Sequence, residues 1–221
     1  MGCGRKIGPF DCCEIIHGDC TVLLPEIPEG YINMVLTDPP YGINLEYDGY
    51  KDSRENLKKL ISLFLPELFR ISPLTVITTG IPQMFLYPEP TWVLCWYYNW
   101  TNYLTPWGVN TWQPILCYGK DPRAIGLKGD SIQMSAPAIT GLKHPCPKPP
   151  RIWRHLLNRS FPENTNKIIR ICDPFSGSGT TARICKTLGF HYLCFEQSKV
   201  YFEESLQLLE NTSDLFPEFS E

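Results

Sequence analysis

The sequence predicts an α/β protein with a doubly wound, mostly parallel sheet of seven strands and helices on both of its faces. Short apolar runs, rich in β-branched and aromatic residues, alternate along the chain with segments whose apolar residues recur at helical spacing. One run stops at two prolines, and another passes through a glycine-rich turn into a helical pattern. The 221 residues, of which 43% are hydrophobic and 19% charged, suit one domain that spans residues 1–221.

The predicted strands are short runs bounded by turn-forming residues. They lie at residues 14–17, 31–37, 74–79, 92–98, 114–118, 168–172 and 192–195. Apolar side chains at spacings of three and four over residues 57–69 predict an amphipathic helix, capped by Asp52 or Ser53 and kinked by Pro66. Residues 42–52 have no period and predict a mobile loop that closes over a site.

Three other segments lack a clear period. Residues 99–113 carry four aromatic residues among polar ones, a pattern typical of core packing and also of rings that stack on nucleic-acid bases: Trp100, Tyr103, Trp107 and Trp112. Residues 119–142 form an irregular interval between two strands, and residues 212–221 predict a loose acidic tail.

The first notable strand end is Asp38-Pro39-Pro40-Tyr41. Proline lacks the amide donor and restricts the residue before it, so the strand must stop here. Asp38 is therefore presented at a carboxyl end, where open α/β sheets bind their ligands. The two prolines also stiffen the backbone, which keeps the carboxylate and the Tyr41 ring in fixed relative positions.

The second is Asp173-Pro174-Phe175-Ser176-Gly177-Ser178-Gly179-Thr180-Thr181, which reads as strand, glycine turn and helix. Gly177 and Gly179 permit a tight turn and a close approach to a ligand. Glu196 closes the next strand, where its carboxylate can accept hydrogen bonds from two ribose hydroxyls. The same spacing also satisfies a dinucleotide fingerprint, which leaves a nicotinamide enzyme as an alternative.

Together the two stretches resemble the DNA amino-methyltransferases, which transfer a methyl group from S-adenosylmethionine to an exocyclic base nitrogen. The sequence resembles their permuted β group, because the catalytic loop precedes the cofactor loop. The resemblance covers roughly residues 10–210 and implies a Rossmann-like methyltransferase core. It assigns catalysis to one loop: Asp38, Pro39, Pro40 and Tyr41.

The resemblance also implies a set of cofactor-binding residues. Lys143-His144-Pro145-Cys146-Pro147-Lys148-Pro149 is similar to a family motif near the methionine portion of the cofactor, although Cys146 and Pro147 depart from it. Asp19, which can also cap a short helix, is expected near the adenine. The full set is Asp19, Asp38, His144, Lys148, Asp173, Phe175, Ser176, Gly177, Ser178, Gly179, Thr180 and Glu196.

Aspartate at the first position of the catalytic loop is commoner among adenine-N6 enzymes of the family, so Asp38 favours adenine. Cytosine N4 is the alternative base. An RNA methyltransferase and a catalytically inactive DNA-binding relic are two further alternatives. The interval 119–142 corresponds to the family's target-recognition segment and is short.

Charge and cysteine content bear on nucleic-acid binding, on metal binding and on the location of the protein. The net charge is −3, yet residues 120–159 contain eight basic and two acidic side chains, which suits either a solvated surface or a phosphate backbone. The ten cysteines form no Cys-x-x-Cys pair, and no histidine stands at zinc spacing, so no metal site is predicted. Reduced thiols and the lack of a long apolar span predict a cytoplasmic protein, in a bacterial or phage-infected cell, without membrane contact. DNA is the expected partner, with a cognate restriction nuclease and a homodimer as further expectations.

Overall fold

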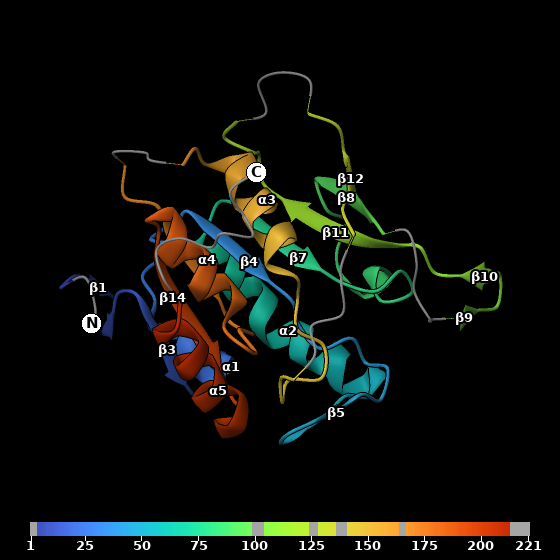
Figure 1. Ribbon diagram of the computed structural model, residues 1–221, viewed down its shortest axis with the longest axis horizontal. Coiled ribbons are helices and arrows are strands. Elements are labelled where there is room, and N and C mark those ends of the chain that lie inside the picture. The colour runs from blue at the N-terminus through green and yellow to red at the C-terminus, as the bar shows by residue number, and fades with distance from the viewer. Residues whose placement is uncertain (1–3, 99–103, 124–127, 136–140, 164–166, 213–221) are drawn as a thin grey trace.

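The computed structural model describes residues 4–98, 104–123, 128–135, 141–163 and 167–212. Its centre is one eight-stranded sheet with the order β12-β8-β11-β7-β4-β13-β14-β3 (Figure 1). The strands are β3 (Glu14–His17), β4 (Met34–Thr37), β7 (Thr75–Thr78), β8 (Trp92–Tyr97), β11 (Trp112–Tyr118), β12 (Ser131–Gln133), β13 (Arg170–Asp173) and β14 (His191–Glu196).

The sheet is mostly parallel, as predicted. In the described part of the chain, β11 alone runs antiparallel to its neighbours β7 and β8. All seven predicted strands are present. The prediction of seven was one too few, because β12 adds an eighth strand beside β8 from within the interval 119–142. Its three residues are too short for an alternating pattern to be recognised in the sequence.

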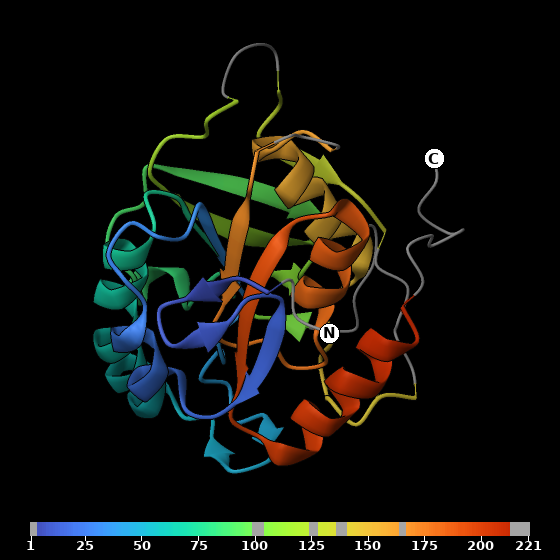
Figure 2. The ribbon, with the colours of Figure 1, turned by 90° about the vertical axis from the view of Figure 1, so that its left-hand side faces the viewer.

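Helices cover both faces of the sheet, so the doubly wound arrangement is confirmed (Figure 2). One face packs against α1 (Cys20–Leu23) and α2 (Arg54–Ile71), whose side chains Leu57, Phe64 and Leu68 are fully buried. The other face packs against α3 (Pro150–Ser160), α4 (Thr180–Leu188) and α5 (Lys199–Glu210). Two single-turn helices, η1 (Leu24–Glu26) and η2 (Met84–Leu86), lie in connections.

The predicted helix over residues 57–69 is α2, and Ser53 caps it through a hydrogen bond from the amide of Asn56. The helix continues past Pro66 to Ile71. Asp52 is not the cap. Its buried carboxylate instead accepts hydrogen bonds from the amides of Gly42, Ile43 and Leu45, and so orders the loop before the helix.

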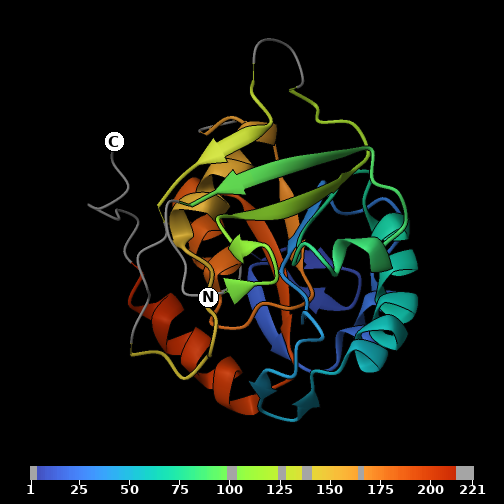
Figure 3. The same cartoon turned by 90° about the vertical axis from the view of Figure 1, so that its right-hand side faces the viewer.

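Three small hairpins stand outside the central sheet. They are β1 (Lys6–Ile7) with β2 (Phe10–Asp11), β5 (Glu46–Tyr47) with β6 (Tyr50–Lys51), and β9 (Leu104–Thr105) with β10 (Gly108–Val109). The β5–β6 hairpin lies in the predicted loop 42–52, where strands of two residues give no readable period. The β9–β10 hairpin extends away from the sheet on the side of β8, β11 and β12 (Figures 1 and 3).

Some sequence predictions concern residues outside the described ranges. Trp100, Tyr103 and nearly all of the expected acidic tail are among them. No helix that the structure describes is long and apolar enough to span a membrane.

Candidate active site

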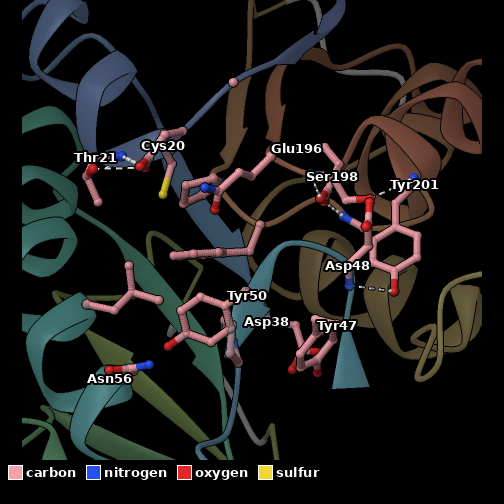
Figure 4. Close-up of a pocket in the computed structure, with 18 of the residues that line it drawn as sticks. Cys20, Thr21, Asp38, Tyr47, Asp48, Tyr50, Asn56, Glu196, Ser198 and Tyr201 are labelled. Carbon is pink, nitrogen blue, oxygen red and sulfur yellow. Dashed lines mark hydrogen bonds between the residues drawn. The ribbon is translucent and has the colours of Figure 1, made fainter. Parts of the chain in front are cut away.

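The carboxyl ends of four neighbouring strands surround one pocket. Parallel strands β4, β13, β14 and β3 lie side by side, so the residues that follow them meet at one edge of the sheet. They line a pocket of about 310 Å³ (Figure 4). Asp38 enters it from β4, Phe175 from β13, Glu196 from β14 and Asp19 from β3.

Glu196 is the last residue of β14 and its carboxylate receives two backbone hydrogen bonds. The amide of Gly177 donates to Oε2 over 2.7 Å, and that of Ser198 donates to Oε1 over 2.8 Å. Burial raises the pKa of Glu196 to about 7, against the lowering effect of these amides. Glu196 thus ties the glycine turn to the end of β14.

The glycine turn requires glycine at two positions for its backbone conformation. Gly177 and Gly179 have φ angles of +52° and +77°, a region that favours glycine. A Cβ on Gly177 would lie 2.8 Å from Nε2 of His144, and one on Gly179 would lie 3.0 Å from Cβ of Ser205. Gly179 is also the N-cap of α4, whose first amides have no partner within the helix.

Asp173 stabilises the glycine turn through side-chain hydrogen bonds. Its buried carboxylate accepts hydrogen bonds from the hydroxyls of Thr37 and Thr181 and from the amide of Phe175. Burial raises the pKa of Asp173 to about 6. The structure therefore places this residue between the two loops, where it connects β4 to β13 and α4.

A second, smaller cavity of about 30 Å³ continues from the pocket toward α4, and Asp38, His144, Phe175 and Gly177 line both spaces. The hydroxyl of Ser176 is buried beside it and has no hydrogen-bond partner among the described groups. Its other lining residues are Cys146, Pro147, Lys148, Trp153, Asp173, Ser178 and Thr180.

The Asp38 carboxylate is held from three sides. Oδ1 accepts hydrogen bonds from the hydroxyls of Tyr41, over 2.7 Å, and Thr78. Oδ2 forms an ion pair with Nζ of Lys148, over 2.5 Å, and Lys148 is only 8% exposed. The same ammonium lies 5.0 Å from the centre of the Tyr41 ring. Lys148 thus contacts Asp38 and Tyr41, two of the four residues that the sequence assigns to catalysis.

Two residues of this network were missed in the sequence. Thr78 ends β7, so its place at a strand's carboxyl end was a usable signal. Gln113 donates from Nε2 to the Tyr41 hydroxyl, but it lies at the start of β11. Only the reversed direction of that strand brings Gln113 to this edge, and no local pattern indicates the reversal.

His144 lies at the junction of the two cavities. Its amide and that of Lys143 donate to the carboxylate of Glu204, and its ring packs against Tyr47 and Tyr201. Burial lowers the pKa of His144 to about 4, so the ring is neutral at pH 7.

The β5–β6 hairpin lies along one side of the pocket (Figure 4). The Ser198 hydroxyl donates to Asp48, over 2.7 Å, and the Asp48 amide donates to the Tyr201 hydroxyl, over 3.3 Å. These contacts hold the hairpin against the start of α5.

Most of the predicted site residues line these two spaces. Pro39, Tyr41 and Gly179 do not, although Tyr41 contacts Asp38 directly and Gly179 shapes the turn. Asp19 lines the pocket and also caps α1, since its carboxylate accepts from the amide and hydroxyl of Thr21.

The donor set suits S-adenosylmethionine. The pocket offers carboxylates for ribose hydroxyls, apolar surface from Phe175 for a ring, and a backbone turn that a Cβ would obstruct. The unpartnered Ser176 hydroxyl and the amides at the start of α4 provide polar groups for an amino-acid end.

Comparisons with known proteins agree with this arrangement. A family model described as DNA methylase, of the N6/N4 type, matches residues 96–207. The type II methyltransferase M.HpaI of Haemophilus parainfluenzae is 23% identical over an alignment 248 positions long, which spans 94% of this chain and 77% of the relative.

Among solved structures, the PvuII DNA methyltransferase, described as cytosine-N4-specific, superposes with a TM-score of 0.69 at 15% identity, covering 87% of this chain and 84% of that one. The M1.HpyAVI complex with S-adenosylmethionine gives 0.63 at 19% identity, covering 89% and 98%. These likenesses establish the fold, and the family match spans half of the chain. This protein therefore belongs to the N6/N4 DNA methylases, the S-adenosylmethionine-dependent enzymes that methylate exocyclic amino groups of DNA bases.

Proposed function

We propose that this chain methylates the N6 amino group of adenine in DNA, with Asp38 as the residue that binds and activates that group. The observation that carries the proposal is the position of the Asp38 carboxylate, which lies in both cavities at once. An aspartate at this position of the loop favours adenine within the family. The bound cofactor supplies an electrophilic methyl group.

The residues around the larger pocket bind the adenosyl part of the cofactor. Glu196 accepts hydrogen bonds from the ribose hydroxyls, Asp19 lies at the adenine end, and Phe175 contributes apolar surface. The smaller cavity, with Ser176, His144 and the amides before α4, binds the methionine part. Asp173 and Gly179 act indirectly, because they hold the turn in the required conformation.

Asp38 retains room for the target amino group. A carboxylate has about four lone-pair positions, and three are used by Tyr41, Thr78 and Lys148. The remaining position on Oδ2 can accept an N–H of the base, and the Pro39 carbonyl can accept the other. These bonds favour a pyramidal nitrogen with its lone pair free for attack. The positive charge that develops on nitrogen then lies beside a carboxylate.

The base must leave the double helix to reach this position. Tyr41 would stack on it, since the hydrogen bonds to Asp38 and Gln113 fix the orientation of its ring. Lys148 contacts both the Asp38 carboxylate and the Tyr41 ring in this structure. Entry of a base over that face of the ring therefore requires the ammonium to shift.

Cytosine N4 is the second candidate, favoured by the cytosine-N4 specificity of the PvuII enzyme among the similar structures. Transfer of labelled methyl from S-adenosylmethionine to unmethylated DNA, followed by nucleoside separation, decides between them. Label in N6-methyladenine supports the proposal, and label in N4-methylcytosine overturns the choice of base. Absence of label with the cofactor bound would favour RNA or an inactive relic. A cognate nuclease and a homodimer stay predictions from the resemblance.

Cofactor binding is predicted to weaken as the pH falls through 7. The ribose hydroxyls need an ionised acceptor, and the pKa of Glu196 is about 7. Its ionised fraction falls from about 90% at pH 8 to about 10% at pH 6, so the affinity should fall roughly tenfold. Isothermal titration with S-adenosylmethionine at both pH values measures this change.

Unfolding does not explain such a loss at pH 6. Folding raises the pKa of Glu196 from 4.5 to about 7, so the folded state binds this proton more tightly than the unfolded state does. The group therefore favours the folded state more at pH 6 than at pH 8. The control is Glu196→Gln, whose affinity should be nearly equal at the two pH values. An unchanged pH dependence in that variant would assign the effect to another group.

Trp107 is predicted to contact DNA. Its side chain is 98% exposed at the tip of the β9–β10 hairpin, which precedes β11 and hence Gln113 at the active-site edge. Removal of an aromatic ring that stacks on a base costs about 1–3 kcal/mol, so Trp107→Ala should raise the KM for DNA roughly 5- to 150-fold without altering cofactor affinity.

The matched control is Trp92→Ala. Trp92 is 59% exposed but begins β8, at the opposite edge of the sheet. Steady-state kinetics with a DNA duplex should show little change in KM for this variant. Equal effects of the two substitutions would exclude a specific role for the hairpin.

A further inference from the structure

Two adjacent cysteines and one histidine meet at the sheet edge opposite the active site. The Sγ atoms of Cys12 and Cys13 are 3.6 Å apart, and they lie 3.0 Å and 3.9 Å from Nδ1 of His191. We call these three residues the CCH cluster. Cys12 is buried, and the other two are partly buried. Neither family motif includes any of them.

The spacing of the three atoms suits one metal ion. Zinc binds thiolate sulfur at about 2.3 Å and imidazole nitrogen at about 2.0–2.1 Å in a tetrahedron. Simple geometry then places the two sulfurs about 3.8 Å apart and each sulfur about 3.6 Å from the nitrogen. The observed separations lie close to these values, so small side-chain adjustments would complete three corners of a tetrahedron. The sulfurs are too far apart for a disulfide, whose S–S bond is about 2.05 Å.

The backbone is shaped to bring the adjacent thiols together. Successive side chains of an extended strand point to opposite sides, which would separate them. Cys13 instead has a φ of +66°, an uncommon conformation for a residue other than glycine. The amide of Cys13 donates to the carbonyl of Tyr192 over 2.8 Å, which holds the pair beside His191.

The CCH cluster lies far from the catalytic chemistry. His191 is the first residue of β14 and Glu196 is the last, so the strand separates them by roughly 17 Å. A metal here would be structural. It would join the start of β14 to the segment after the β1–β2 hairpin, since the amide of Cys12 bonds to the carbonyl of Arg5. That hairpin packs Ile7 into the core and Phe10 against Phe195.

The donors indicate the kind of ion. Two thiolates with one imidazole favour a borderline-soft divalent ion over Mg²⁺ or Ca²⁺, which prefer oxygen. Cys13 and His191 also line a cavity of about 670 Å³ that gives access from solvent. Each thiol releases its proton to solvent as its sulfur binds the ion. Water or another donor would complete the tetrahedron.

We infer that the CCH cluster binds one Zn²⁺ ion, which fastens the N-terminal hairpin to the central sheet. The inference is independent of the proposed adenine specificity, because none of the three residues lines either cavity that contains Asp38. An ion that binds the folded state alone stabilises it by an amount that grows with the logarithm of the ion concentration above its Kd. Zn²⁺ at about a hundred times its Kd should raise the thermal midpoint by roughly 5–10 °C.

The test uses the full chain, purified under reducing conditions and stripped with a chelator. Zn²⁺ is titrated in competition with a chromophoric chelator, and Co²⁺ is titrated separately to record its absorption spectrum. One equivalent of Zn²⁺, an intense tetrahedral thiolate spectrum with Co²⁺, and the rise in thermal midpoint are expected. Absence of stoichiometric binding by the reduced, folded chain would overturn the inference.

Variants then locate the site. Cys12→Ser and His191→Ala should each lose the Co²⁺ spectrum and at least about tenfold in Zn²⁺ affinity. Cys95→Ser, which removes a partly buried thiol on β8, should bind as the wild type does. Wild-type affinity in Cys12→Ser would contradict the inference.

If the ligand variants do not fold, zinc-edge X-ray absorption of the wild-type protein still reports the ligands. At least two sulfurs and one imidazole support the CCH cluster, and a site made only of oxygen and nitrogen donors refutes it.

Discussion

Asp38→Ala is expected to reduce methyl transfer by roughly a thousandfold or more while S-adenosylmethionine still binds. In the proposed mechanism the carboxylate both orients the target amino group and lies beside the charge that develops on it, so its loss would remove two contributions that act in the transition state. In the proposed binding mode, the cofactor's adenosyl contacts come from other residues of the pocket, around Glu196. Single-turnover transfer of labelled methyl measures the rate, and calorimetry measures cofactor affinity.

Two further variants separate chemistry from folding. Asp38→Asn keeps the shape of the side chain and removes its charge, so it avoids a cavity beside Lys148. It should also lose most of the rate. Asp48→Asn makes the same change at another carboxylate that lines the pocket and should keep activity within about threefold. Near-wild-type turnover in Asp38→Ala would eliminate the proposed mechanism.

Glu196→Ala is expected to weaken S-adenosylmethionine binding by roughly a hundredfold or more. Hydrogen bonds to an ionised group contribute about 1.5–3 kcal/mol each, and the ribose would offer two. The substitution also leaves the amides of Gly177 and Ser198 without their acceptor, which loosens the turn. Equilibrium binding of the cofactor measures the effect directly.

Glu196→Gln isolates the role of the charge. The amide keeps one oxygen acceptor, so its affinity should fall between those of the wild type and the alanine variant. Glu203→Gln is the matched control, because Glu203 is an exposed carboxylate on α5 away from the pocket lining. Unaltered cofactor affinity in Glu196→Ala would place the ribose elsewhere.

Local sequence determined much of this protein. The seven longer strands, α2 and its cap, and the turn before α4 follow from short-range periodicity and from proline and glycine at strand ends. The motifs at Asp38 and Asp173 also identified the family, since each is a contiguous stretch. The side chain that a strand presents at its carboxyl end can be read without knowledge of its neighbours.

Contacts between distant segments were decided by the tertiary structure alone. Lys148 lies 110 positions from Asp38, and its ion pair depends on how α3 packs over the sheet. Gln113 reaches Tyr41 because β11 runs antiparallel to its neighbours. The three residues of β12 join the sheet by pairing with the edge of β8.

The spacing of the cysteines in the sequence indicates no metal site. His191 is 178 positions from Cys13, and only the pairing of β14 with β3 brings them together. Periodicity reports which face of an element is buried, whereas these sites depend on which elements become neighbours.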